Sequence, residues 1–155
     1  MIDISTSKVF TMIAGSSVAL LAMLQPNNYR NTEPDARVEI TKVIEVFIKA
    51  GDARNRDELH TVLHDHFRVV ANQLMGSSAV NVITKDQYLA LIADGKLGGD
   101  TRTLSIQSLE IIGRNASARV KITGKQLTFE SFYHLIQTDK GQWQLIQDLP
   151  FATKN

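Results

Sequence analysis

The chain has 155 residues, 43% of them hydrophobic and 21% charged, which suits a single globular domain with a core of its own. A formal net charge of +1, without any long basic stretch, argues against nucleic acid as a partner. The absence of cysteine excludes disulfides, thiolate metal sites and a cysteine nucleophile.

The N-terminal part of the chain differs in composition from the rest. Residues 9–24 contain no charged side chain and are slightly short for a membrane-spanning helix. They fit an export signal, a membrane anchor, or a helix that packs on the domain or a partner. Membrane contact is expected only here, and localisation stays open between the cytoplasm and export to the periplasm. A polar, proline-containing linker follows, so we assign residues 1–33 to this segment and 34–155 to the folded domain.

The first two predicted helices follow the linker. Thr32 is a suitable capping residue, with an acidic residue and a proline in the first turn. Apolar residues then recur at helical spacing and predict one buried face: Ile40, Val43, Ile44, Phe47 and Ile48. Gly51 is predicted to end this helix. A shorter helix fits from Arg56 to about His64.

Two short strands and a third helix come next. Residues 67–74 and 79–83 are predicted strands, separated by a turn that contains glycine and serine. Thr84 and Gln87 have the spacing of a capping box, which predicts a helix from this point to Gly95.

The rest of the chain is predicted to be strand. Four runs with alternating or continuous apolar residues are TLSIQSLEIIG, RNASARVKITG, LTFESFYHLIQT and WQLIQDL. Asp139-Lys140-Gly141 is a hairpin turn between the last two. Helices early in the chain and antiparallel strands late predict an α+β domain, with helices on one face of a curved sheet. Such a curved sheet tends to leave a cavity beneath it.

Four short motifs occur in order between residues 34 and 152. They are Gly51-Asp52 at the end of the first helix, Leu63-His64 before Phe67, a helix over residues 84–92, and an aromatic run over 129–135 that leads through Asp139-Lys140-Gly141 to Trp143. Their order and spacing resemble the nuclear transport factor 2-like superfamily, most of all its lumazine-binding-like and SnoaL-like groups. The resemblance implies a cone-shaped α+β fold, with three helices packed on a curved, mainly antiparallel sheet.

The chain departs from the pattern of these groups at two places. After the second helix they often have His-Pro followed by an acidic or amide residue, whereas this chain has His64, Asp65 and His66. Five positions after Trp143 a basic residue is common, and here it is Asp148. The isomerase and cyclase branches place an acid or base in the pocket of the cone, but no position here clearly matches one of theirs.

The histidines of HTVLHDH are the first candidate site. His60 and His64 are spaced so that they could share a metal on a helix, but the zincin pattern is absent and His66 is predicted to lie beyond the helix end. We therefore predict no metal site and no cofactor. His66 is the candidate catalytic acid or base, because the start of the first strand lies near the mouth of the cone in this fold.

Aromatic residues are the second candidate site. Core packing is the ordinary role of such side chains, but in a cone-shaped fold some of them also line the pocket. The predicted ligand-binding residues are Phe47, Phe67, Tyr88, Phe129, Tyr133 and Trp143. Alternation along residues 127–136 places Phe129 and Tyr133 on the pocket face. The other face mixes charged and aromatic residues, as expected where a sheet meets solvent or a partner subunit.

Three functional hypotheses follow. The first is a domain that binds a small apolar or aromatic molecule and forms a homodimer through the sheet face, a pairing that the resemblance implies. The second is an enzyme, namely an isomerase, cyclase or dehydratase similar to SnoaL or ketosteroid isomerase, which would use general acid–base catalysis without a metal. The third is a non-catalytic, dimeric interaction module. Because fold constrains function weakly, the sequence leaves the ligand and any reaction open.

Overall fold

The computed structural model describes residues 33–155. Within this range the helices are α2 (Glu33–Ala53), α3 (Arg56–Val62) and α4 (Lys85–Ala93), with a short 3-10 turn, η2 (Leu74–Gly76). The strands are β1 (Leu63–Asn72), β2 (Val80–Thr84), β3 (Thr103–Ile112), β4 (Asn115–Thr123), β5 (Leu127–Gln137) and β6 (Trp143–Lys154). None of these helices is long and apolar enough to cross a membrane. The predictions for residues 9–24, for the Thr32 cap and for a boundary at residue 33 fall at least partly outside the described residues and stay predictions.

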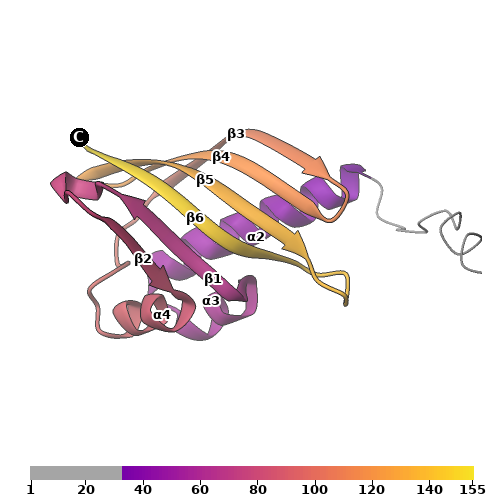
Figure 1. Cartoon of the computed structure of the whole chain (residues 1–155), viewed down its shortest axis with the longest axis horizontal. Helices are drawn as coiled ribbons and strands as arrows, with labels where there is room; N and C mark the ends of the chain where they lie inside the picture. Colours follow the sequence, from indigo (N-terminus) through magenta and orange to yellow (C-terminus); the bar gives the residue numbers. More distant parts are fainter. Residues whose placement is uncertain (1–32) are drawn as a thin grey trace, which may run out of the picture. The chain divides into compact units, whose positions relative to one another are not determined.

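The strands form one sheet in the order β2-β1-β6-β5-β4-β3. Neighbouring strands are antiparallel except β1 and β6, which are parallel because the chain crosses over between them. In Figure 1, α2 lies behind the long strands, and α3 and α4 lie below β1 and β2. The predicted α+β fold, with three helices on a mainly antiparallel sheet, is confirmed.

Helix α2 supplies the central layer of the core. Ile40, Ile44, Phe47 and Ile48 are buried at the predicted i, i+4 spacing. They pack in one cluster with inward residues of the sheet, including Val120 and Leu145. The opposite face of the helix carries charged residues, so its amphipathic pattern fixes which side meets the sheet.

The end of α2 differs from the prediction. The helix continues through Gly51 to Ala53, and Arg54 takes the left-handed conformation, with φ of 53°. Gly51 therefore lies inside the helix, and a Cβ atom there would lie 3.0 Å from Nη2 of Arg102.

Side chains cap the two shorter helices. Asn55 accepts a hydrogen bond from the Glu58 N–H at the start of α3. At α4, Thr84 and Gln87 form the predicted capping box, with the Thr84 N–H donating to Oε1 of Gln87 at 3.0 Å. Helix α3 ends at Val62, earlier than predicted, because Leu63 is already extended and pairs with Leu145 of β6.

Candidate functional site

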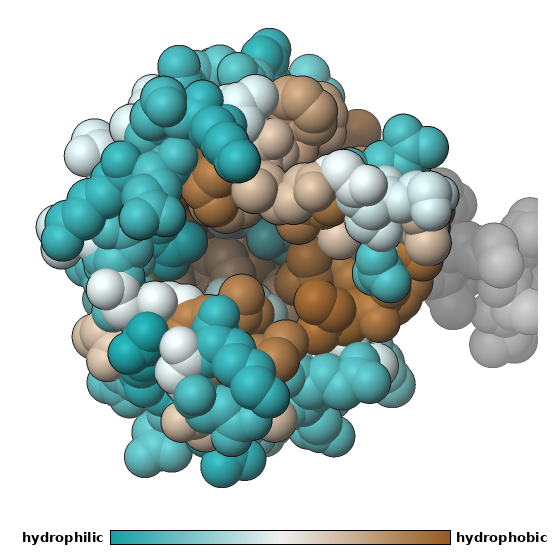
Figure 2. All heavy atoms as spheres, turned by 90° about the vertical axis from the view of Figure 1, so that its left-hand side faces the viewer, coloured by the Kyte–Doolittle hydropathy of each residue, from teal (hydrophilic) through white to brown (hydrophobic). Residues whose placement is uncertain are grey.

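A cavity of about 540 Å³ lies between the inner face of the sheet and the helices. Figure 2 looks into its opening, where a hydrophobic interior is surrounded by a mainly hydrophilic rim. Its wall contains Phe47, Val69, Ala71, Leu74, Ile83, Tyr88, Leu97, Ile122, Leu127, Phe129, Tyr133 and Pro150. Its polar or backbone-exposing residues are Gly98, Gly99, Asp100, Arg102, Lys125, Gln126, Ser131 and Asp148. The size and the mostly apolar wall are typical of a small-molecule site.

Four of the six predicted ligand-binding residues line this cavity. Phe47 lies at their centre, stacked on Tyr88 with ring centroids 5.9 Å apart and edge-on to Tyr133 at 5.6 Å. Phe129 lines the wall closer to the β4–β5 turn. Residues from α2, α4 and β5, distant in sequence, therefore form one aromatic surface. Their role in binding remains a prediction.

Phe67 and Trp143 lie outside the cavity lining. Phe67 is buried behind the aromatic wall, with its ring 5.5 Å from Tyr88 and 6.1 Å from Phe47. Trp143 is buried at the beginning of β6. Both belong to the hydrophobic core, so any effect on a ligand would act through the residues that they support.

The expected position of His66 is corrected by the structure. His66 lies on β1 but is exposed and does not line the cavity. Inward-facing positions on this strand are taken by Phe67, Val69 and Ala71, whereas His66 lies between Leu63 and Arg68, where the register with β6 is irregular. Its backbone N–H donates to Nδ1 of His64 at 3.1 Å. A catalytic role inside the cavity therefore has no geometric support at this residue.

The remainder of HTVLHDH has a structural explanation. Lys85, only 5% exposed, donates to the Leu63 carbonyl at 2.8 Å and to Oδ1 of Asp65 at 3.0 Å. The lysine holds the pKa of Asp65 below its usual value through this hydrogen bond and its charge. The segment thus ties the start of β1 to the start of α4. Within residues 33–155, no group of three histidine or carboxylate side chains is arranged to hold a metal ion.

Asp148 is an acidic residue in the lining of the cavity. It pairs with Tyr133 on β5 and with Val69 on β1, both of which face inward. The register of β5 and β6 shifts between the Leu135–Leu145 and His134–Gln147 pairs, which leaves Ile146 as an extra residue. This bulge allows Leu145 and Asp148 to face the same side, although they are an odd number of residues apart.

The surroundings of Asp148 favour its neutral form. Burial raises the pKa of the carboxyl to about 7, whereas the hydrogen bond from Ser131 and the charge of Arg102 lower it. Its Oδ1 is buried and has no hydrogen-bond partner among the described residues. Asp148 keeps some surface only because it borders the cavity. The cavity is therefore bordered by a residue whose carboxyl group does not use its full hydrogen-bonding capacity.

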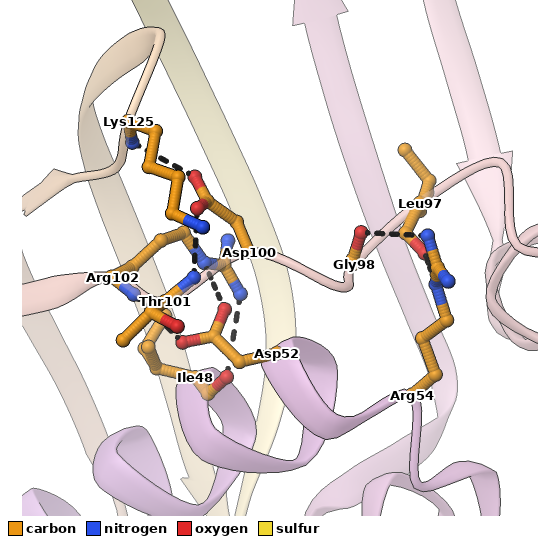
Figure 3. Close-up of polar contacts among 9 residues, drawn as sticks. All are labelled: Ile48, Asp52, Arg54, Leu97, Gly98, Asp100, Thr101, Arg102 and Lys125. Atoms are coloured by element: carbon orange, nitrogen blue, oxygen red, sulfur yellow. Dashed lines mark hydrogen bonds and ion pairs between the residues drawn. The ribbon is translucent and has the colours of Figure 1, made fainter.

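Arg102 stands beside the cavity but is already paired. Its Nε donates to Oδ1 of Asp52, its N–H donates to Oδ2 of the same carboxylate at 3.0 Å, and Nη2 donates to the Ile48 carbonyl at 3.3 Å (Figure 3). Both side chains of this ion pair are less than one fifth exposed. Asp52 therefore balances most of the charge that Arg102 presents to the cavity.

A second arginine, Arg54, binds the loop between α4 and β3, which forms one side of the cavity rim. Arg54 donates from Nε to the Leu97 carbonyl at 3.1 Å, and from Nη2 to the carbonyls of Gly95 and Gly98 at 3.1 and 3.2 Å. Figure 3 shows this guanidinium beside the loop. Asp100, in the same loop, accepts the Lys125 N–H at 3.0 Å and thus joins the β4–β5 turn to the rim. The opening is therefore bordered by segments that are tied together.

Sequence reasoning missed Asp148 as a site residue, although a signal was present. It is the acidic residue at the position where related chains often have a basic one, in a strand that otherwise contains no charge between residues 143 and 151. Simple alternation from Leu145 places it on the outer face, so only the bulge identifies it as a cavity residue.

Comparisons with solved structures give the same fold. A nuclear transport factor 2-like protein of unknown function from Shewanella baltica has a TM-score of 0.70 at 14% identity, covering 81% of this chain and 99% of that one. Those from Silicibacter pomeroyi, also of unknown function, and Cytophaga hutchinsonii have TM-scores of 0.68 and 0.66 at 16% and 20% identity. They cover 81% and 79% of this chain, and 100% of their own lengths. No curated protein matches the chain.

The sequence also matches a family model. The match extends over residues 35–149. It therefore covers the helices and strands around the cavity and leaves out only the first and last few described residues. The description of that family is "Putative lumazine-binding". With the fold, the chain thus belongs to this family, within the nuclear transport factor 2-like superfamily.

Proposed function

We propose that this domain binds a small, mainly apolar molecule in the cavity, with Asp148 as its internal polar contact. The observation that carries the proposal is the mostly apolar cavity with Asp148 in its lining, a residue whose buried Oδ1 has no hydrogen-bond partner among the described residues. An unsatisfied buried acceptor costs about 1–3 kcal/mol, which a ligand with a donor would recover. The description of the family also favours a small flat molecule, which suits the aromatic wall.

A pair of neighbouring substitutions tests this proposal. Ala71 lines the cavity, whereas Val70 faces the outer side of β1. The neutral fluorophore N-phenyl-1-naphthylamine serves as a probe of the cavity, and native mass spectrometry of the purified full chain detects any retained ligand. We expect Ala71→Phe to weaken binding of the fluorophore at least tenfold and to remove a retained ligand, because the added ring occupies the cavity.

Val70→Phe is the matched control, since it adds a ring of the same kind to the same strand on the opposite face. It should bind the fluorophore like the unsubstituted chain. If Ala71→Phe, shown to be folded by circular dichroism, binds the fluorophore as tightly as Val70→Phe does, the cavity is not the binding site and the proposal fails.

An acid–base enzyme is the second candidate function. The observation that favours it is the raised pKa of Asp148, about 7, which poises a carboxyl inside an apolar cavity for proton transfer near neutral pH. Asp148 thus replaces His66 as the candidate for the isomerase, cyclase or dehydratase hypothesis. The test is the rate of deuterium exchange at the carbon atoms next to the carbonyl of 4-phenylbutan-2-one, followed by NMR. If this rate is equal with and without the protein, the domain is not an acid–base enzyme for ketones.

A further inference from the structure

We propose that the cavity selects protonated amines that carry an apolar body, and that the ammonium group pairs with Asp148. This inference rests on the ligand-binding function proposed above and specifies the chemical class of the ligand. It is carried by three features of the site: the unpartnered carboxyl oxygen, the charges around it and the aromatic wall.

The carboxyl oxygen supplies the first argument. Oδ1 of Asp148 is buried without a partner among residues 33–155, whereas Ser131 already hydrogen-bonds to the carboxyl. Because Asp148 lines the cavity, an N–H group of a ligand could hydrogen-bond to its carboxyl group after a small shift of the side chain. A charged donor would do so more strongly than a neutral one, because charge-assisted hydrogen bonds are stronger, most of all where water is excluded.

The charges around Asp148 supply the second argument. Five other titratable groups line the same cavity, and Asp52 on α2 pairs with one of them: Tyr88 on α4, Asp100 and Arg102 in the α4–β3 loop, Lys125 in the β4–β5 turn and Tyr133 on β5. Burial raises the pKa of both tyrosines, so they stay neutral. Backbone N–H groups lower the pKa of Asp100, which stays ionised. With Arg102 balanced by Asp52, acidic groups exceed basic ones by one when Asp148 is ionised, and a monocation restores neutrality.

The aromatic wall supplies the third argument. Tyr133 pairs directly with Asp148 across the β5–β6 strand pair, and Phe47 and Tyr88 pack next to it. Aromatic rings attract a cation through the negative potential of their faces, and this attraction strengthens when the cation is desolvated. The remaining apolar wall would hold the hydrocarbon part of the ligand. A ligand carboxylate would instead lie against Asp148 and be repelled.

Three compounds with one carbon skeleton test the inference: 4-phenylbutan-2-amine, 4-phenylbutan-2-ol and 4-phenylbutan-2-one. Isothermal titration calorimetry on the full chain measures each affinity at pH 8.0 and pH 5.5. At pH 8.0 we expect the amine to bind at least tenfold more tightly than the alcohol or the ketone. At pH 5.5 its affinity should fall about 30-fold, because Asp148 titrates near pH 7 and must lose its proton to pair with the ammonium group.

Two variants locate the effect. Asp148→Asn should lose the preference for the amine over the alcohol and the pH dependence of amine binding. Asp139→Asn changes the net charge equally in an exposed hairpin turn away from the cavity, and should keep both. Circular dichroism shows whether Asp148→Asn is folded.

Two results separate failure of this inference from failure of the proposed function. If the fluorophore binds but the three compounds have equal affinity, or the ketone binds best and more tightly at pH 5.5, the amine class is wrong while ligand binding stands. If neither the fluorophore nor any of the three compounds binds, the proposed function fails and the amine class fails with it.

Discussion

Asp148 couples the stability of the fold to pH. Burial raises its pKa to about 7 in the folded chain, from 3.8 for an aspartate in water. The folded state therefore holds this proton more tightly than the unfolded state does between these two values. The stability contributed by the bound proton is fully present below about pH 4 and is lost as the pH rises towards 7. Asp148 thus destabilises the domain at neutral pH, which is typical of a residue kept for function.

Replacement of this carboxyl by an amide should remove the destabilisation at neutral pH. We expect the free energy of unfolding of Asp148→Asn, relative to the unsubstituted chain, to increase between pH 4 and pH 7, by at most about 4 kcal/mol, and to change little above that. Urea denaturation followed by fluorescence of the single tryptophan, Trp143, measures it. Parallel stability curves for the two proteins over this range would show that Asp148 keeps an ordinary pKa in the folded state.

At the scale of elements, the loop between α4 and β3 forms a fixed part of the cavity rim. The Gly99 N–H donates to the Asp52 carbonyl at 3.0 Å, and Arg54 binds the loop carbonyls. Gly98 has a φ of +72°, and a Cβ atom there would lie only 2.0 Å from the Gly51 carbonyl oxygen. The loop can approach the end of α2 this closely only with glycine at this position.

A pair of glycine substitutions tests the close contact. Gly98→Ala should lower the free energy of unfolding by about 3 kcal/mol or more, because strain at positive φ adds to displacement of backbone. Gly113→Ala is the control: Gly113 also has a positive φ, +59°, but has open space around it, so only about 1–2 kcal/mol is expected. Equal losses in urea denaturation would mean that the loop moves away without cost, and that the rim is not fixed.

At the scale of the whole molecule, the outer face of the sheet has an apolar row across four strands. Val82 pairs with Val70, and Leu149 pairs with Phe132, while the parallel pairing of β1 and β6 places Val70 beside Leu149. Val82 and Phe132 are 55% and 50% exposed. A continuous exposed apolar surface of this kind is typical of an interface. We propose that two copies of the domain pair through this row, as the sequence resemblance implies.

Phe132→Glu should convert the proposed homodimer into a monomer, because it places a charge in the apolar row of a self-complementary surface. Size-exclusion chromatography with light scattering on the full chain measures the mass. Ile112→Glu is the control, since Ile112 is 77% exposed but lies at the end of β3, outside the row. A monomeric unsubstituted chain, or a dimer that withstands Phe132→Glu, would rule out pairing through this face.

Local patterns in the sequence predicted most of the fold. The i, i+4, i+7 spacing of Ile40, Ile44 and Phe47 identifies the buried face of α2, and the Thr84–Gln87 capping box places the start of α4. Alternation along β5 correctly separates Phe129 and Tyr133 from the outer face. These features depend on neighbours within one or two turns or along one strand, so one sequence contains the information.

By itself, the sequence determined the α+β class, the order of elements and four cavity aromatics, because these follow from periodicity and local hydrogen bonding. Only the tertiary structure decided which polar group the cavity contains. The bulge at Ile146 arises from the pairing of β6 with β5, and it turns Asp148 inward. His66 lies in the part of β1 where the register with β6 is irregular, and it is exposed there. Whether a side chain reaches the cavity depends on strand register between distant segments, which local spacing does not contain.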